Sequence, residues 1–151
     1  MTVIDGVKLI PRLRHSDDRG YVTEILRSDE EHFENFGQAY VTGCYPGVVK
    51  AWHKHSKQTD YFYVVTGTMK VGLYDDRPDS PSLGTYQVVM LGERGDDAQL
   101  MIPAGIWHGM MAIETFSVML NIPTALYDYD DPDEERVAWD AFEGIWTVKN
   151  R

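Results

Sequence analysis

Residues 47–67 read Gly47-Val-Val-Lys-Ala-Trp-His53-Lys-His55-Ser-Lys-Gln-Thr-Asp60-Tyr-Phe-Tyr-Val-Val-Thr-Gly67, a spacing of G-x5-H-x-H-x4-D-x6-G. Because strand side chains alternate between two faces, His53 and His55 are predicted to share one face of a strand. Asp60 follows on what reads as the next strand. Further along, Pro103-Ala-Gly-Ile-Trp-His108 adds a third histidine after a Pro-Gly turn. We therefore expect these four polar side chains to form one cluster.

Together the two stretches resemble the paired motif of the cupin β-barrel, with Asp60 at the position where cupins usually carry glutamate. The remaining chain alternates short apolar or aromatic runs with Gly, Pro and Asp turns, which is typical of a sandwich or closed barrel. We expect an all-β fold, a cupin double-stranded β-helix (jelly-roll) barrel with one or two short helices. The expected strands are 21–26, 38–45, 48–55, 61–65, 68–74, 85–90, 99–102, 109–112 and 116–122.

The length of 151 residues suits one domain. We expect a single cupin domain over residues 1–151, with an N-terminal strand arm at about 1–27, the barrel at about 38–122 and a C-terminal docking tail at 123–151.

Two short segments carry helical signals. Ser28 and Glu31 form a capping box that predicts a helix ending at Gly37. The acidic tail is expected to be helical near residues 133–139, and its aromatic residues indicate that it docks on the barrel.

The net charge of −10 argues against a general affinity for nucleic acid or for an anionic membrane. An anionic substrate would need a local basic lining, for which Arg14, Arg19 and Lys50 are the candidates. The single cysteine, Cys44, excludes an intrachain disulfide and is expected to be a small buried residue. With no signal-peptide pattern at the N-terminus and no apolar run of membrane-spanning length, we expect a cytoplasmic protein without a membrane partner.

Three imidazoles and a carboxylate are a normal ligand set for Fe(II), Mn(II), Ni(II) or Zn(II). His53, His55, Asp60 and His108 could therefore hold a divalent metal. The alternative is a metal-free barrel in which Asp60 pairs with one of the histidines. The residues alone leave both open.

Beyond the cupin motif, the chain from about residue 17 to 146 resembles the dTDP-4-keto-6-deoxyglucose (dTDP-4-dehydrorhamnose) 3,5-epimerase family. The segments that carry this resemblance are Asp17-Asp-Arg19-Gly-Tyr21, similar to D-x-R-G-aromatic; Val48-Val-Lys50-Ala-Trp-His53, similar to V-x-R-G-L-H; Asp75 to Gly84, similar to D-x-R-x-x-S-P-x-x-G; Ile102 to Gly109, similar to I-P-x-G-x-x-H-G; and Tyr127 through Trp139-Asp140 to Trp146, similar to the family's Y-x-x-x-x-E and W-D-D-P-x-L-G-I-x-W close.

The resemblance implies an enzyme of deoxysugar biosynthesis that needs no cofactor and takes a nucleotide-sugar substrate. It implies that His53 removes the acidic proton next to a sugar C4 ketone, and that Asp140 orients His53. Arg19 matches a residue that reaches the nucleotide phosphate, and Lys50 replaces the arginine before the base, which keeps the charge but loses the bidentate fork. The resemblance further implies a homodimer in which Arg19 serves the partner's pocket.

Three positions depart from the family pattern. Asp60 aligns with the lysine that steadies the enolate oxygen, Asn121 with the tyrosine acid, and His55 with a glutamine. A carboxylate beside a developing enolate is repulsive. Either a metal held by the four-residue cluster or an imidazolium at His55 or His108, paired with Asp60, would replace the lysine.

Asparagine cannot donate a proton as tyrosine does, which argues against a full 3,5-epimerisation unless Tyr63 or Tyr74 substitutes. A single epimerisation or a 3,4-keto shift on one face fits better. By strand alternation, however, Tyr63 should point away from Asp60. Tyr63, Tyr74 and Trp107 are candidates for substrate binding, together with Arg19, Lys50, His55 and Asn121.

Three hypotheses therefore stand. The first is an epimerase or isomerase of a nucleotide-linked 4-keto-6-deoxy sugar with His53 as base. The second is a metal-dependent cupin, an oxygenase or a metal-assisted isomerase. The third is a sugar-binding or structural barrel that kept the fold and lost the chemistry.

Overall fold

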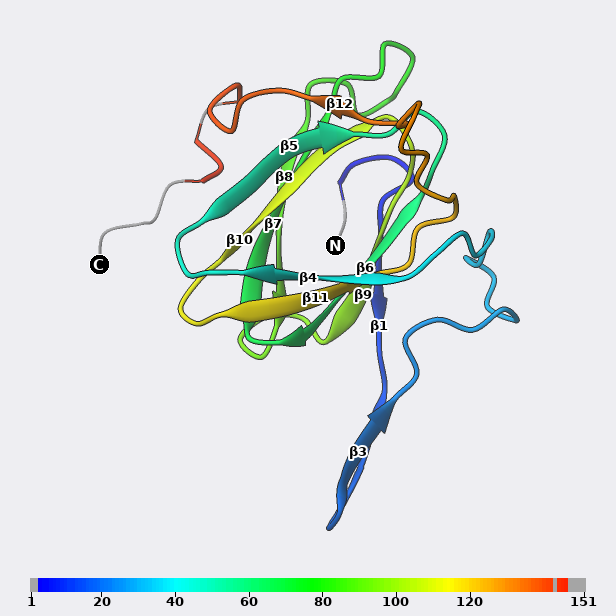
Figure 1. Ribbon diagram of the computed structural model, residues 1–151, viewed down its shortest axis with the longest axis vertical. Coiled ribbons are helices and arrows are strands. Elements are labelled where there is room, and N and C mark those ends of the chain that lie inside the picture. Colours follow the sequence, from blue (N-terminus) through cyan, green and yellow to red (C-terminus); the bar gives the residue numbers. More distant parts are fainter. Residues whose placement is uncertain (1–2, 143, 147–151) are drawn as a thin grey trace.

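The structure, a computed structural model, describes residues 3–142 and 144–146. Two antiparallel five-stranded sheets face each other, and a separate two-stranded hairpin stands apart (Figure 1). The first sheet has the order β1 (Lys8–Pro11), β9 (Ala98–Ile102), β6 (Asp60–Thr66), β11 (Ser117–Asn121) and β4 (Tyr40–Cys44). The second has the order β12 (Glu135–Arg136), β5 (Val49–Lys54), β10 (Ile106–Ala112), β7 (Thr68–Asp75) and β8 (Tyr86–Gly92). The predicted all-β barrel is confirmed.

The main core lies between the two sheets and follows from strand alternation. Its largest members are fully buried and come from both sheets: Phe62, Met69, Leu73, Leu91, Leu100, Ile102, Ile106 and Met119. Burying a side chain of this size contributes roughly 1.5–3 kcal/mol, so the two facing sheets form one stable unit. Cys44 is fully buried at the end of β4, as predicted.

A second apolar cluster covers the outer face of the second sheet, where the C-terminal tail packs. Trp52 lies at its centre, with ring centroids 5.2 Å from Phe142 and 4.9 Å from Trp146. The Trp52 indole also donates a hydrogen bond to the carbonyl of Trp139. Because Trp52 occupies the outer face of β5, the next residue, His53, faces the barrel interior.

Both predicted helices are wrong for the part of the chain that the structure describes. Residues 28–32 form turns, because the nearby carboxylates pair with arginines instead of capping a helix: Glu30 binds Arg12, and Asp29 binds Arg27. The segment at 133–139 contains β12, which adds to the edge of β5 in an antiparallel register. Strand pairing satisfies the backbone there without a helix.

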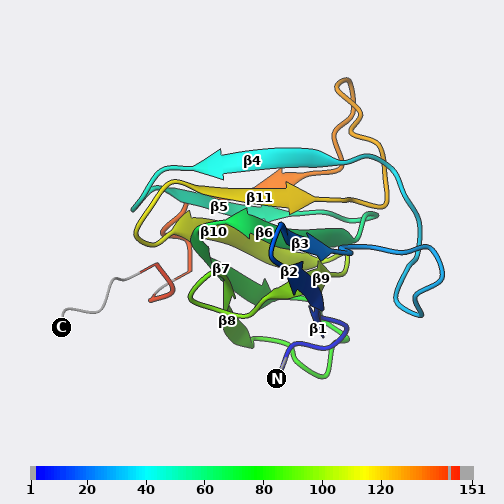
Figure 2. The ribbon, with the colours of Figure 1, turned by 90° about the horizontal axis from the view of Figure 1, so that it is seen from below.

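The N-terminal arm contributes two strands, β1 and β2 (Arg14–Asp17), that the pattern did not predict. β1 pairs with β9, and β2 pairs with β3 (Gly20–Thr23) in a hairpin that projects from the barrel (Figure 1). In Figure 2, β4 and β11 run side by side, with β5 and β10 of the second sheet beneath them. The described residues include no helix that could cross a membrane.

Candidate active site

The four residues of the sequence motif converge inside the barrel. His53 lies on β5, His55 directly after it, Asp60 begins β6, and His108 lies on β10. The ring centroids of His53 and His108 are 4.1 Å apart, and each is 5.5 Å from that of His55. Asp60 Oδ2 lies 3.4 Å from Nε2 of His55 and 3.2 Å from Nε2 of His108. The predicted cluster is confirmed.

A glycine permits the close approach of the two strands that carry His53 and His108. These histidines are direct partners in the β5–β10 register, and the register shifts immediately afterwards. A Cβ added at Gly109 would lie 2.3 Å from the Cβ of Ala51 and 2.8 Å from the Lys50 carbonyl oxygen. Only glycine lets β10 lie this close to β5, which explains the glycine that follows His108 in the sequence.

Backbone carbonyls fix the orientation of two imidazoles. Nδ1 of His55 donates to the carbonyl of Asp133, and Nδ1 of His108 donates to the carbonyl of Ile106 at 2.9 Å. A neutral histidine carries one ring proton, so both Nε2 atoms then present lone pairs toward Asp60. The buried Nε2 of His108 makes no hydrogen bond of good geometry in this state. The cluster therefore has room to take up an additional proton or a cation at this nitrogen.

The second oxygen of Asp60 is held by two amides. Gln58 Nε2 donates to Oδ1 at 3.0 Å and Asn121 Nδ2 at 2.8 Å. Asn121 Oδ1 accepts from the backbone N–H of Tyr61 at 3.1 Å, so its NH2 group must face Asp60. The same NH2 group donates to the Tyr40 hydroxyl at 2.9 Å.

The environment shifts two pKa values in ways that matter for chemistry. Burial, reinforced by the charge of His108, holds the pKa of His53 well below its ordinary value, so His53 is neutral at physiological pH. Burial alone would raise the pKa of Asp60, but the adjacent imidazoles of His108 and His55, together with the hydrogen bond from Asn121, outweigh it and lower that pKa. Asp60 is therefore a carboxylate, and His53 is a free base.

His53 opens into a cavity of about 390 Å³ between the two sheets. One wall comes from β5 and β12 and includes His53 and Arg136, whereas the opposite wall comes from β4, β6 and β11 and includes Tyr40 and Phe62. Thr42, Lys50 and Glu134 add to its polar lining. No residue in the described ranges makes a hydrogen bond to a ring nitrogen of His53.

A family model for dTDP-4-dehydrorhamnose 3,5-epimerase matches residues 1–147. The chain belongs to this family. It is 44% identical over 139 residues to the spore coat polysaccharide biosynthesis protein SpsL of Bacillus subtilis, covering 91% of each chain. It is 43% identical over 129 residues to the probable low-salt glycan biosynthesis epimerase Agl13 of Haloferax volcanii, covering 83% of this chain and 82% of that one.

A crystal structure of a dTDP sugar isomerase from Desulfovibrio desulfuricans superposes with a TM-score of 0.89 at 31% identity, covering 97% of this chain and 94% of that one. The cupin jelly roll is confirmed by this likeness. The protein is an enzyme, a sugar-nucleotide epimerase or isomerase.

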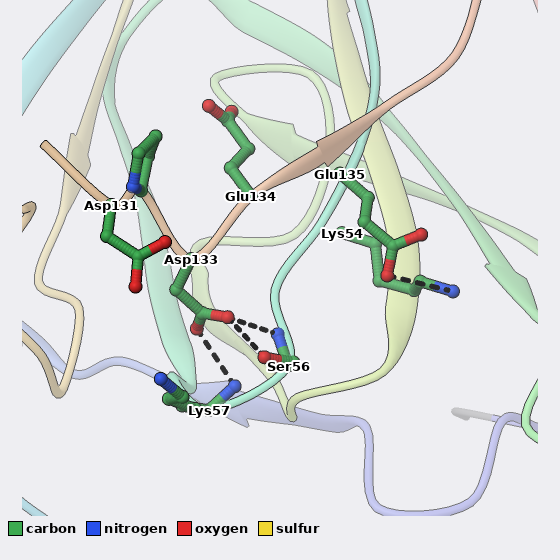
Figure 3. A pocket seen from close by; sticks show the side chains of 8 residues that line it. Lys54, Ser56, Lys57, Asp131, Asp133, Glu134 and Glu135 are labelled. Carbon is green, nitrogen blue, oxygen red and sulfur yellow. Dashed lines mark hydrogen bonds and ion pairs between the residues drawn. The ribbon is translucent and has the colours of Figure 1, made fainter. Parts of the chain in front are cut away.

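The C-terminal tail is hydrogen-bonded to the loop that follows β5 (Figure 3). The Asp133 carboxylate accepts hydrogen bonds from the backbone N–H groups of Ser56, Lys57 and Gln58 and from the Ser56 hydroxyl. Figure 3 shows Asp133 pointing into this loop, and the Asp133 carbonyl holds His55. The small pocket between Lys54 and the tail is thus a structural junction that carries β12 to the mouth of the cavity.

Several residues that the sequence nominated lie away from the cavity. Tyr63 donates its hydroxyl proton to Asp97 at 2.7 Å on the outside of the first sheet, which confirms that it points away from Asp60. Tyr74 stacks on Tyr86, with ring centroids 4.3 Å apart. Trp107 donates to Asp76 at 2.7 Å. Each sits on a strand face opposite to the interior.

Two further nominated residues are on exposed segments. Arg19 lies at the tip of the β2–β3 hairpin, where it pairs with Asp17, and its side chain is 85% exposed. Asp140 lies in an exposed turn of the tail and, among the described residues, makes no hydrogen bond to His53. Lys50 does line the cavity, and its ammonium is held by the carbonyl of Gly43 at 2.6 Å.

The titratable cavity residues Tyr40, Glu134 and Arg136 were missed by the sequence analysis. Tyr40 and Arg136 stand on strands whose partners could not be read from the pattern, and Glu134 lies next to the unpredicted β12. A signal did exist for Tyr40: the strand expected at 38–45 contains it. Only the pairing of Tyr40 with Asn121 makes its position informative.

Proposed function

We propose that this enzyme acts on a nucleotide-linked 4-keto-6-deoxy sugar and that His53 removes the proton from the carbon next to the ketone. The observation that carries the proposal is the state of His53: its ring lines the cavity, it is neutral, and no described residue competes for its lone pair. A general base of this kind works best when it is unprotonated at the operating pH. The family of the chain supports the substrate class.

The enolate that forms needs a positive partner, and the cluster around Asp60 can supply one. The Nδ1–H groups of both rings donate to backbone carbonyls, so a further proton would bind at Nε2. Protonation of His55 or His108 there gives an imidazolium paired with Asp60. In a dry site such a cation stabilises developing negative charge on the ketone oxygen. Asp60 keeps the cation in place, so the carboxylate acts through the imidazoles.

The cavity accommodates the sugar, and the nucleotide extends outward. A volume of about 390 Å³ is at the low end of small-molecule sites, which span roughly 300–1,000 Å³. Lys50 and Arg136 line the cavity and provide positive charge for a diphosphate, and Glu134, which pairs with Arg136 at 2.9 Å, offsets part of that charge. In a chain of net charge −10, this local basic lining is what an anionic substrate requires.

A homodimer would bring a third basic residue to the substrate. The β2–β3 hairpin projects from the barrel, and Tyr21 and Val22 on it are 55% and 65% exposed (Figure 1). A projecting hairpin that carries Arg19 and exposes two apolar side chains is suited to reach across to a second copy. Light scattering should give twice the chain mass, and Arg19→Ala should raise KM more than it lowers kcat.

Deuterium exchange tests the assignment of His53. With dTDP-4-keto-6-deoxyglucose in D2O, the wild-type enzyme should introduce deuterium at C3 or C5, and His53→Ala should lower the rate by about 10²- to 10⁴-fold. His15→Ala, a histidine on the exposed hairpin, is the matched control and should exchange normally. Absence of exchange by the wild type on every 4-keto sugar tested would refute the proposal.

A metal-dependent cupin is the second candidate, and one observation favours it. The ligand atoms of His53, His55 and His108 lie within 4.8 Å of one another. Donation of Nδ1 to a backbone carbonyl is the usual support for an imidazole that binds a metal through Nε2. These residues fit a divalent ion, which would act as a Lewis acid on the ketone oxygen. His53 would then be a ligand and not the base.

Elemental analysis separates the two candidates. Protein purified without added metal should contain well below one equivalent per chain if His53 is the free base. One equivalent of Fe, Mn, Ni or Zn per chain, with activity that is lost on chelation and restored by that ion, would favour the metal-dependent reading.

A further inference from the structure

The cavity has two facing walls, and each carries an aromatic side chain able to move a proton. His53 belongs to β5 of the second sheet, and Tyr40 belongs to β4 of the first. Figure 1 shows β5 and β10 on one side of the barrel and β4 and β11 on the other. A sugar ring seated between them would present one face to the imidazole and the opposite face to the phenol.

The hydroxyl of Tyr40 is anchored in a way that leaves its own proton free. It accepts a hydrogen bond from Asn121 Nδ2 at 2.9 Å. The orientation of that amide is fixed, because Asn121 Oδ1 accepts from the backbone N–H of Tyr61. Since Tyr40 is the acceptor in its contact with Asn121, its O–H proton can point into the cavity. The same N–H would stabilise the phenolate after the proton has left.

The protonation state of Tyr40 agrees with this geometry. Burial, together with the negative charge of Asp60, raises the pKa of Tyr40 above its ordinary value, although the bond from Asn121 opposes the shift. The phenol is therefore protonated at neutral pH. Tyr63, Tyr74 and Tyr61 cannot take this role, because their hydroxyls or rings are engaged outside the cavity.

We propose that Tyr40 is the catalytic acid that protonates the substrate on the ring face opposite His53. This rests on the proposed function and deepens it, because an acid on the second face makes the enzyme a configuration-inverting epimerase. Asn121 is a positioning residue that holds the Tyr40 oxygen and links it to Asp60.

The proton balance is complete without a co-reactant. His53 takes the proton from the carbon beside the ketone, and the C–H electron pair forms the C=C bond of the enolate while the ketone oxygen becomes negative. The carbonyl then re-forms as the same carbon takes the Tyr40 O–H proton on the other face. The His53 imidazolium and the Tyr40 phenolate return to their starting states by proton exchange with solvent.

Tyr40→Phe tests the assignment, with Tyr45→Phe as the matched control on the same stretch of chain. Tyr45 is 71% exposed and packs on Phe116, away from the cavity. Both variants would be incubated with dTDP-4-keto-6-deoxyglucose in D2O, and two quantities followed by NMR: deuterium entry into recovered substrate and formation of the inverted product.

Tyr40→Phe should lower the rate of product formation by at least about 100-fold. It should keep deuterium entry into unchanged substrate within about tenfold of the wild-type rate, because His53 still removes and returns the proton on one face. Tyr45→Phe should match the wild type in both. Retention of exchange also shows that the variant is folded, so a merely structural role would not give this split.

Three outcomes would overturn the assignment: a Tyr40→Phe enzyme that inverts at the wild-type rate, one that loses exchange together with inversion, or a wild type that exchanges but forms only a keto-shifted product without inversion. All three leave wild-type exchange intact. Failure of the proposed function would instead appear as a wild type that does not exchange at all.

Discussion

Asp60 and Asp75 are both buried carboxylates, 1% and 0% exposed, yet their surroundings differ completely. Asp75 accepts five hydrogen bonds, and every donor comes from Arg77, Ser80 or Ser82 within seven residues along the chain. Asp60 instead faces two amides and two imidazole Nε2 atoms from separate elements. A buried charge that is saturated locally supports the fold, whereas one that leaves its partners short of a proton is suited to chemistry.

The largest effect is expected from Asp75→Asn. The substitution keeps the size of the side chain but replaces one accepting oxygen with an NH2 group. This NH2 group faces the donors of Arg77 and the serines, so one buried donor loses its acceptor. We expect the free energy of unfolding to fall by about 3 kcal/mol. Urea denaturation at pH 7 measures it. An unchanged unfolding free energy would mean that the hydrogen bonds of Asp75 do not stabilise the fold.

An effect of the same size should appear when the pH is lowered. Burial alone would raise the pKa of Asp75, but the bonds from Arg77, Ser80 and Ser82 outweigh it and lower that pKa below its unfolded value. The stabilisation is then present above the unfolded pKa of about 3.9 and is lost as the pH falls toward the folded value. The stability difference between wild type and Asp75→Asn should be constant from pH 5 to 8 and shrink below about pH 4. A difference that grows in acid would contradict this sign.

Gly109→Ala should disturb the histidine cluster around Asp60. A methyl group at this position meets Ala51 at 2.3 Å, so β10 must move away from β5. We expect a loss of about 2 kcal/mol in unfolding free energy and a fall in kcat, because His108 would leave its place beside His53. Gly84→Ala is the control, since no heavy atom would lie within 4 Å of its Cβ and its backbone strain (φ 79°) affects stability alone. Equal kcat values for the two variants would argue against the close approach as a catalytic requirement.

Asp133→Ala should have the smallest effect on stability. It removes the acceptor for three backbone N–H groups in the loop after β5, but two of them, those of Ser56 and Lys57, are exposed and can bind water. We expect a loss of about 1 kcal/mol. KM should rise, because β12 brings Arg136 to the cavity. Lys57→Ala on the same loop keeps these backbone bonds and should leave KM unchanged.

The sequence predicted the barrel and the cluster because both depend on local spacing. The alternation of His53 and His55 and the turn before His108 suffice to place three imidazoles on the interior face. The hydrogen-bond donors to Asp75 are open to prediction as well, because they follow it closely in the chain. Most of the predicted strands, from 38–45 to 116–122, correspond to observed ones.

What the sequence did not predict depends on long-range pairing. Residues 133–139 carry a helical composition, but the free edge of β5 draws Glu135 and Arg136 into β12. Tyr40 became a site residue only through the register that sets it opposite Asn121. The segment at 28–37 lacks a helix because Arg12, distant in the sequence, engages Glu30. Arg19 could be nominated from a motif, but no local pattern says which pocket it serves.

The most direct test of the account is Asp60→Asn, measured beside Asp75→Asn for both unfolding free energy and kcat. An asparagine at position 60 can donate to the two Nε2 lone pairs at 3.2 and 3.4 Å, so the unfolding free energy should change by less than about 1 kcal/mol. Without the carboxylate, an imidazolium at His55 or His108 loses the negative charge that stabilises it, so kcat should fall by about 10²- to 10³-fold. Asp75→Asn should show the reverse, a large loss of stability with kcat retained. If Asp60→Asn unfolds as easily as Asp75→Asn, or turns over at the wild-type rate, the cluster of His53, His55, Asp60 and His108 is not the active site described above.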